Sequence, residues 1–187
     1  KNATIYSVQI FIFLLLSIMP NSKDYNYKYC SQVYPTIVLS KPTKKADWHS
    51  PPNIRVCPDV KISESRIISA TKYWKRLGYE FGYITYETNM YNCLVPPPLR
   101  REILIMLPDQ KFNEDHLAST RLLTSKFTNE IVGAKIFITT KNSQRERILE
   151  HEFGHAFGWS HYSQSGHIMN PNWKYGGYGS YGMKKDN

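Results

Sequence analysis

The sequence predicts an α/β fold (of the α+β type) in which a mixed β-sheet is backed by one helix and followed by a second helix that carries histidines. Two observations predict this fold. Segments with strand-like patterning and segments of helical period follow one another in the order strand, helix, strand, strand, hairpin, helix. The chain also has 187 residues, 41% hydrophobic and 21% charged, which is typical of one globular domain with its own core.

An apolar run precedes the predicted domain. Residues 10–19, IFIFLLLSIM, follow a weakly basic start and are too few to span a bilayer comfortably, so they match the core of a signal peptide. We expect residues 1–22 to be a signal peptide or hydrophobic leader and the protein to be exported, either extracellular or periplasmic. The following SIMPNSKD has no clean small-x-small cleavage pair, so an uncleaved anchor or a buried first strand stays open. Residues 23–52, polar and rich in tyrosine, are expected to form an arm or a short pro-segment.

Residues 53–187 are expected to form the folded domain, and its elements follow from periodicity and from glycine and proline positions. The helix over Ser63–Leu77 has apolar residues at helical spacing and ends at Gly78. The strand before it stops at Pro58, and the last two strands form a hairpin. The predicted strands are residues 53–60, 81–88, 101–109, 117–123 and 131–139.

The second helix is predicted from its two ends. Ser143 and Glu146 have the spacing of a capping box, SQRE, in which each side chain bonds the backbone N–H of the other residue. Apolar residues continue at helical spacing to Phe157, and Gly158 then permits a left-handed turn.

The histidines of this helix predict a metal site. His151 and His155 are four residues apart, so their imidazoles project from one face of a helix, one turn apart. The reversal at Gly158 can bring His161 back as a third ligand. Three neutral imidazoles suit one Zn²⁺ ion and leave its fourth tetrahedral position to water, which is the mark of a catalytic site. Glu152, beside them, would be the general base that takes the proton of this water, and the implied reaction is hydrolysis of an amide.

The pattern HExxHxxGxxH is specific, because five fixed residues should occur by chance in about one chain in 10⁵ of this length. HEFGHAFGWSH followed by HIMNP resembles the metzincin metallopeptidases, and most closely their matrixin branch. The resemblance implies a zinc endopeptidase with a twisted five-stranded mixed sheet, a backing helix and an active-site helix.

The resemblance also implies roles for further residues. Met169 would form a turn beneath the metal histidines without ligating the ion. Residues 117–123 would be an antiparallel edge strand that binds the substrate as an added strand. The segment after Met169, NPNWKY, would form the wall of the pocket for the side chain that follows the scissile bond. The substrate-binding residues implied in this way are Leu117, Ala118, Ser119, Thr120, Arg121, Pro171 and Trp173.

The sequence departs from the matrixin pattern in several places. Matrixins have a helix after the Met-turn, whereas residues 174–187 are rich in glycine and tyrosine and are not expected to be helical, so the domain would be minimal or truncated. No PRCGxPD cysteine switch occurs. Cys30 could ligate zinc in a precursor, join a disulfide or be idle, and Cys57 with Cys93 is the favoured disulfide pair. Asp109, Glu114 and Asp115, with His116, could form an accessory calcium site or belong to a solvated loop.

The charge balance bears on partners. The chain carries a formal net charge of +9, with a pI of about 9.4, but its lysines and arginines are spread along the chain, with no spacing typical of nucleic-acid-binding modules. We expect a solvated basic surface, a protein or peptide substrate, no nucleic-acid partner and no stable membrane insertion. Two alternatives stay open: a hydrolase of cell-wall peptides, and a catalytically idle zinc module that binds peptides. The presence of Glu152 argues against the idle module.

Overall fold

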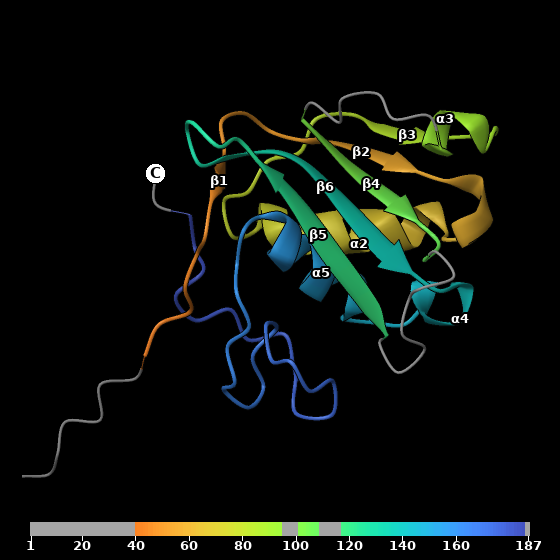
Figure 1. The fold of residues 1–187 in the computed structure, drawn as a ribbon. Coiled ribbons are helices and arrows are strands. Elements are labelled where there is room, and N and C mark those ends of the chain that lie inside the picture. The colour runs from red at the N-terminus through yellow and green to blue at the C-terminus, as the bar shows by residue number, and fades with distance from the viewer. Residues whose placement is uncertain (1–39, 95–100, 109–116, 186–187) are drawn as a thin grey trace, which may run out of the picture. The chain divides into compact units, whose positions relative to one another are not determined.

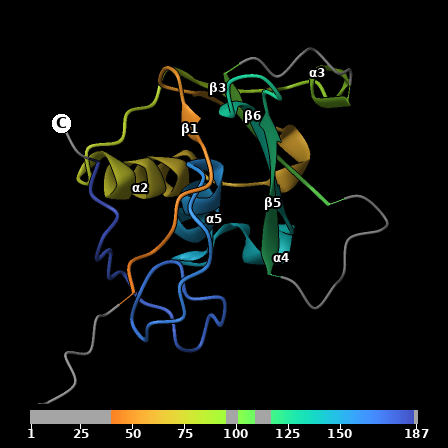
Figure 2. The same ribbon diagram turned by 60° about the vertical axis from the view of Figure 1, so that its left-hand side comes forward.

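The computed structural model describes residues 40–94, 101–108 and 117–185, which belong to one compact unit, Leu39–Asn187. A β-sheet forms one layer of this unit. The helices α2 (Glu64–Lys75) and α5 (Ile148–Ala156) cover one face of the sheet (Figures 1 and 2). The prediction of an α/β fold with a backing helix and a histidine-bearing helix is thereby confirmed.

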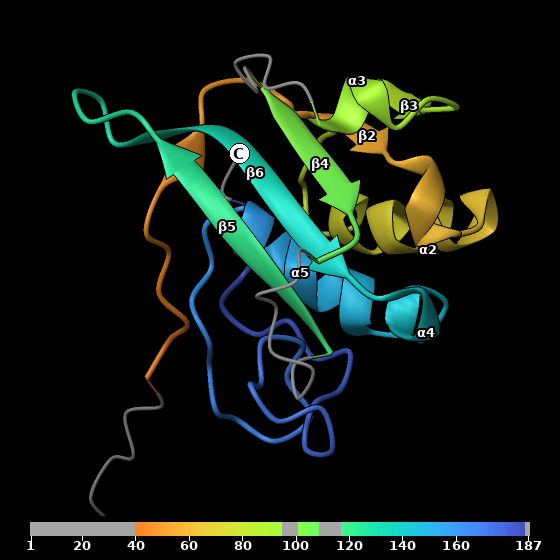
Figure 3. The same ribbon diagram turned by 45° about the vertical axis from the view of Figure 1, so that its right-hand side comes forward.

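The sheet has six strands and is mostly parallel. Its order is β1-β6-β4-β2-β3, and all these pairs are parallel, whereas β5 pairs antiparallel with β6 (Figure 3). Five strands lie within or close to the five predicted, and the sixth, β1, has two residues and is too short to show a period. The strands are β1 (Asp47–Trp48), β2 (Asn53–Val56), β3 (Ile84–Tyr86), β4 (Glu102–Met106), β5 (Ala118–Thr124) and β6 (Glu130–Ile138).

The start of the second helix was predicted wrongly. Residues Thr140–Ser143 form a separate short helix, α4, in which the Ser143 hydroxyl is buried and donates to the carbonyl of Thr140 (2.9 Å). The capping box therefore does not form. Instead, Arg147 takes a left-handed conformation, with φ of 67°, and α5 begins at Ile148. Two more short helices were not predicted, η1 (Pro58–Val60) and α3 (Tyr91–Leu94).

The core lies between the sheet and the two long helices. Trp74 of α2 and Phe153 of α5 are fully buried against isoleucines that the central strands point toward the helices. Parallel strands covered by helices are apolar along their length, and the predicted central strand β4 fits this rule. The disulfide expected between Cys57 and Cys93 is present, and both residues are buried.

The described part of the expected arm, residues 40–52, packs along the C-terminal end of α5. The Lys45 N–H donates to the Gly158 carbonyl (2.8 Å), and the Ser160 N–H donates to the Thr43 carbonyl (2.9 Å). A Cβ at Gly158 would lie 2.1 Å from the Ala46 carbonyl oxygen, and φ there is 91°, so only glycine fits the turn predicted at this position.

Residues 157–185 contain no helix, so the prediction that residues 174–187 are not helical holds for the described residues 174–185. The tail instead packs on α2, where the Tyr73 hydroxyl donates to the Tyr178 carbonyl (3.1 Å) and Met183 is fully buried. None of the helices in the described ranges is long and apolar enough to cross a membrane. The leader, Cys30 and the candidate accessory-site residues Asp109, Glu114, Asp115 and His116 lie outside the described residues.

A buried ion pair joins the two long helices. The guanidinium of Arg66, on α2, bonds both carboxylate oxygens of Glu150, on α5, and also donates to the Arg145 carbonyl. The side chains of Arg66 and Glu150 are only 8% and 3% exposed. Trp74 adds a bond from its indole N–H to the Glu150 carbonyl (2.8 Å). These contacts fix α5 against α2 one residue before His151.

Substitution Arg66→Met should lower the free energy of unfolding by about 3 kcal/mol, because it leaves a buried carboxylate without its partner. Chemical denaturation of the disulfide-intact protein measures this loss. Lys75→Met, which removes an exposed charge from the same helix, is the matched control and should unfold like the wild type. The double variant Arg66→Met/Glu150→Leu should recover part of the loss, and an unchanged midpoint in Arg66→Met would contradict the assignment.

Candidate metal centre

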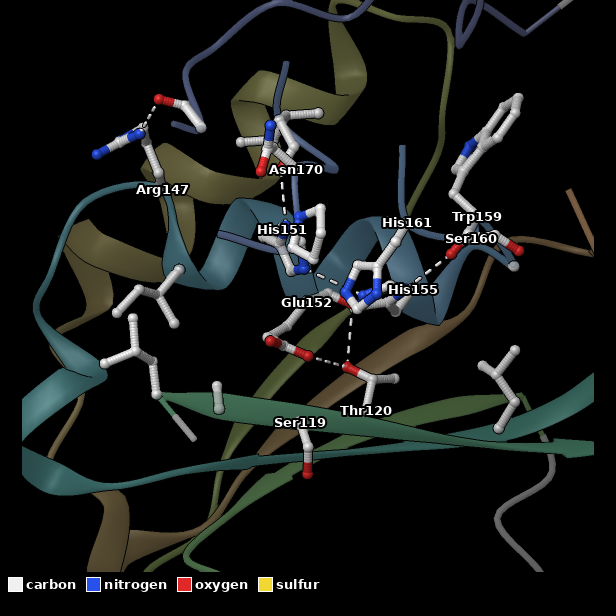
Figure 4. A pocket seen from close by; sticks show the side chains of 18 of the residues that line it. Ser119, Thr120, Arg147, His151, Glu152, His155, Trp159, Ser160, His161 and Asn170 are labelled. Carbon is white, nitrogen blue, oxygen red and sulfur yellow. Dashed lines mark hydrogen bonds between the residues drawn. The ribbon is translucent and has the colours of Figure 1, made fainter. Parts of the chain in front are cut away.

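Three imidazoles converge at the C-terminal half of α5. His151 and His155 lie one turn apart on the helix, and their Nε2 atoms are 3.0 Å from each other. The reversal at Gly158 brings His161 back to the same point, so that one nitrogen from each ring lies within 4.8 Å of the others (Figure 4). The three histidines singled out in the sequence therefore form a group that could hold a metal ion.

The backbone sets the orientation of two of these rings. His151 Nδ1 lies 2.7 Å from the Ile168 carbonyl oxygen, and His155 Nδ1 lies 2.7 Å from the Trp159 carbonyl oxygen. Because a carbonyl only accepts, each Nδ1 carries the proton and each Nε2 keeps a free lone pair. Such outer partners fix the tautomer and orientation of metal-binding histidines.

Burial keeps the rings uncharged. Loss of hydration lowers the pKa of His151 to about 4 and that of His155 to about 3. The pKa of His161 is lowered too, by burial and by the nearby Lys45 ammonium. At neutral pH the three rings are therefore uncharged, and a metal ion would not compete with protons for their nitrogen lone pairs. The set of three imidazoles fits zinc, which prefers nitrogen and sulfur ligands.

Glu152 lies next to the histidines on α5 and faces strand β5 (Figure 4). Its carboxylate Oε2 accepts a hydrogen bond from the Thr120 hydroxyl (2.6 Å), which also lies 3.2 Å from the Glu152 carbonyl oxygen. Burial raises the pKa of Glu152 to about 7, and the bond from Thr120 opposes this rise. A carboxyl with a pKa near neutrality is suited to accept and release a proton.

Met169 lies in a tight turn, as the resemblance implies, and is fully buried against α5. Its sulfur occupies the space that a side chain at Gly154 would need, since a Cβ there would lie 2.3 Å from it. His167 holds this turn, because its Nδ1 accepts from the Met169 N–H (3.1 Å) and its Nε2 donates to the Tyr181 carbonyl (3.2 Å). Hydrogen bonds at both nitrogens make His167 a structural residue.

The histidines open onto a cleft of about 1080 Å³ between β5 and residues 170–177. Within the described residues β5 pairs with β6 alone, so its outer edge is available. Six of the seven predicted substrate-binding residues line the cleft, although the Ser119 hydroxyl points away from Glu152 (Figure 4). The seventh, Arg121, does not line it, and its guanidinium carbon instead lies 5.0 Å from the centre of the Phe137 ring.

Several lining residues were not predicted. Lys45 comes from the expected arm and approaches the site only because that segment pairs with the loop at Gly158. Arg147 was expected inside a helix, and its position at the rim follows from the unpredicted helix start. No local sequence pattern indicated either residue.

No known protein-family model matches the chain, and no similar sequence is found among curated proteins.

Substitution Gly154→Ala should lower the free energy of unfolding by about 1–3 kcal/mol, despite the preference of helices for alanine. Its methyl group would displace Met169 and press on Trp74, whose Cζ2 would be 3.0 Å away. We expect weaker metal binding at the three histidines as well, measured by competition with a chromophoric chelator. In a Met169→Ala background the same substitution should have a smaller effect. An equal effect in both backgrounds would show that Met169 is not the contact.

Proposed function

We propose that the protein is a zinc-dependent endopeptidase of the metzincin type, similar to the matrixins. One observation carries the proposal: three neutral imidazoles converge beside a buried carboxyl of near-neutral pKa, in a cleft bounded by an edge strand. Each of these features also has structural uses, but together they are the parts that peptide hydrolysis requires.

The three histidines would hold the zinc ion, which supplies an acidified water molecule and polarises the substrate carbonyl. The roles of the protein residues follow from their placement. Glu152 Oε2 would take the proton of the attacking water and deliver it to the leaving amine. Thr120 would hold this carboxylate in place during both transfers, since it contacts the carboxylate and the helix backbone together.

The substrate would lie along β5. An extended peptide can add to the outer edge of this strand through backbone hydrogen bonds, which give affinity without demanding particular side chains. Pro171 and Trp173 face β5 across the cleft and would contact the side chains of the peptide. This arrangement fits a protein or peptide substrate.

Export belongs to the same proposal. The Cys57–Cys93 disulfide is typical of oxidising compartments, and the apolar run at residues 10–19 matches a secretory leader. An exported endopeptidase accounts for both observations.

Substitution Glu152→Gln should abolish proteolysis while zinc remains bound, because the amide cannot accept the proton and the three ligands are unchanged. Metal analysis and cleavage of a peptide library, read by mass spectrometry, measure the two effects. Glu146→Gln, at an exposed position shortly before α5, is the control and should keep full activity. Cleavage at the wild-type rate by Glu152→Gln would refute the proposal, as would cleavage that persists after chelation of the metal. Bound zinc without any cleavage by the wild type would favour a module that only binds peptides.

Substitution Thr120→Val should lower kcat roughly ten- to a hundredfold with little change in KM, because Glu152 loses the hydroxyl that orients it. Thr120→Ser keeps the hydroxyl and should stay close to the wild type. The comparison requires equal zinc content and equal thermal stability in the three proteins. A change confined to KM would assign Thr120 to substrate binding instead, as its position on the edge strand alone implies.

A further inference from the structure

We propose that Arg147 binds a carboxylate of the substrate, so that the enzyme selects acidic peptides. The inference rests on the proposed peptidase function and concerns the wall of the same cleft. It is carried by the free edge of one guanidinium, by its neighbours and by the charge of the cleft.

Arg147 is held in place from one side only. Its Nη1 donates both hydrogens, to the Trp173 carbonyl (3.3 Å) and to the Gly176 carbonyl. Within the described part of the chain, no acceptor is bonded to Nε or Nη2. A guanidinium presents Nε–H and Nη2–H as a planar fork that matches the two oxygens of a carboxylate. The side chain is thus anchored by one nitrogen and has its carboxylate-binding edge open.

A second arginine, Arg145, contacts the same indole, although it does not line the cleft. The Cζ atoms of Arg145 and Arg147 are each 4.5 Å from the centre of the Trp173 ring. Two like charges gathered around one indole repel each other, and a bound anion removes this repulsion. Glu146, between them in sequence, is exposed, and no carboxylate of the described residues forms an ion pair with either arginine.

The charge of the whole cleft has the same sign. Among the described residues that line it, Lys45 and Arg147 are cationic, and Glu152 is the single acidic side chain. Arg147 and Trp159 lie at opposite ends of the close view (Figure 4). Lys45 also lines the cleft, and its backbone N–H donates to the carbonyl of Gly158, the residue before Trp159. Positive charge at both ends of a narrow cleft attracts a negatively charged peptide.

The competing explanation is that Arg147 belongs to a solvated basic surface, and Arg121 is an example of an arginine on such a surface. Its side chain is exposed, lies over Phe137 and does not line the cleft. Arg147 differs because it is half-buried, fixed by two carbonyls and faces the cleft. Arg121 therefore serves as the matched control, since its loss changes the net charge equally and leaves the cleft intact.

The test uses the zinc-loaded full chain and a peptide library in which each position around the cut is varied in turn. Glutamate and glutamine are compared at each position, because they have the same shape and differ in charge. The wild type should prefer glutamate by roughly tenfold or more in kcat/KM at one position, the gain expected for one charge-assisted pair. The preference should weaken at high salt.

Three variants locate the effect. Arg147→Gln should lose the preference for glutamate while it still cleaves the neutral peptide, and Arg147→Lys should keep a smaller preference because it retains charge without the fork. Arg121→Gln should behave like the wild type. Thermal unfolding of each variant shows that the fold is intact.

The outcomes separate this inference from the function on which it rests. If the wild type cleaves peptides with no preference between glutamate and glutamine, the inference is wrong and the peptidase stands. A preference that survives in Arg147→Gln, or that Arg121→Gln loses equally, also overturns it. If no peptide in the library is cleaved, the proposed function fails, and equal binding of Glu- and Gln-containing peptides by the zinc-loaded protein then refutes acidic recognition as well.

Discussion

The reversal of the chain at Gly158 is the constraint on which the rest of the site depends. Two histidines on a helix can be placed by helical geometry alone, but the third must come from a segment that turns back sharply. The turn has a left-handed conformation and passes so close to the Ala46 carbonyl that a side chain has no room. One glycine thus joins the helix, the loop that carries His161 and the segment before β1. The geometry of the candidate metal centre follows from this contact between three parts of the chain.

Glu150 and Glu152 lie two residues apart on α5, and their surroundings give the two carboxyl groups different properties. Glu150 is paired with Arg66 and fixes the helix to its neighbour. Glu152 is equally buried but has only the Thr120 hydroxyl as a side-chain partner, so burial dominates and its pKa rises. A charged partner makes the first carboxylate structural. Within the described residues Glu152 has no charged partner, so its carboxyl can exchange a proton.

Much of this arrangement could be predicted from the sequence, because it depends on local patterns. The spacing of His151, His155 and His161, the glycine after the helix and the five longer strands all leave periodic or positional signals. The start of α5 could not be predicted. Ser143 and Glu146 have the spacing of a capping box, but Ser143 is buried in a separate short helix and bonds the Thr140 carbonyl instead. Arg121 was misplaced because the resemblance assigned a whole strand to the substrate, whereas the long side chain of Arg121 extends over Phe137 and not into the cleft. Lys45 reaches the cleft through long-range packing, for which a single sequence has no signal, and Arg147 reaches it because α5 begins one residue later, at Ile148.

Residues 43–46 pair with the loop after α5, so the candidate metal centre is bonded directly to the segment that precedes β1. Two backbone hydrogen bonds, Lys45 to Gly158 and Ser160 to Thr43, lie directly before the third histidine. A displacement of this segment would reach His161 through these two bonds, whereas His151 and His155 lie on a helix that Arg66 joins to α2. Of the three rings of the candidate metal centre, two are thus held by a helix and one by the pairing of its loop with residues 43–46. The spacing of the candidate ligands therefore depends on a segment that lies far earlier in the chain.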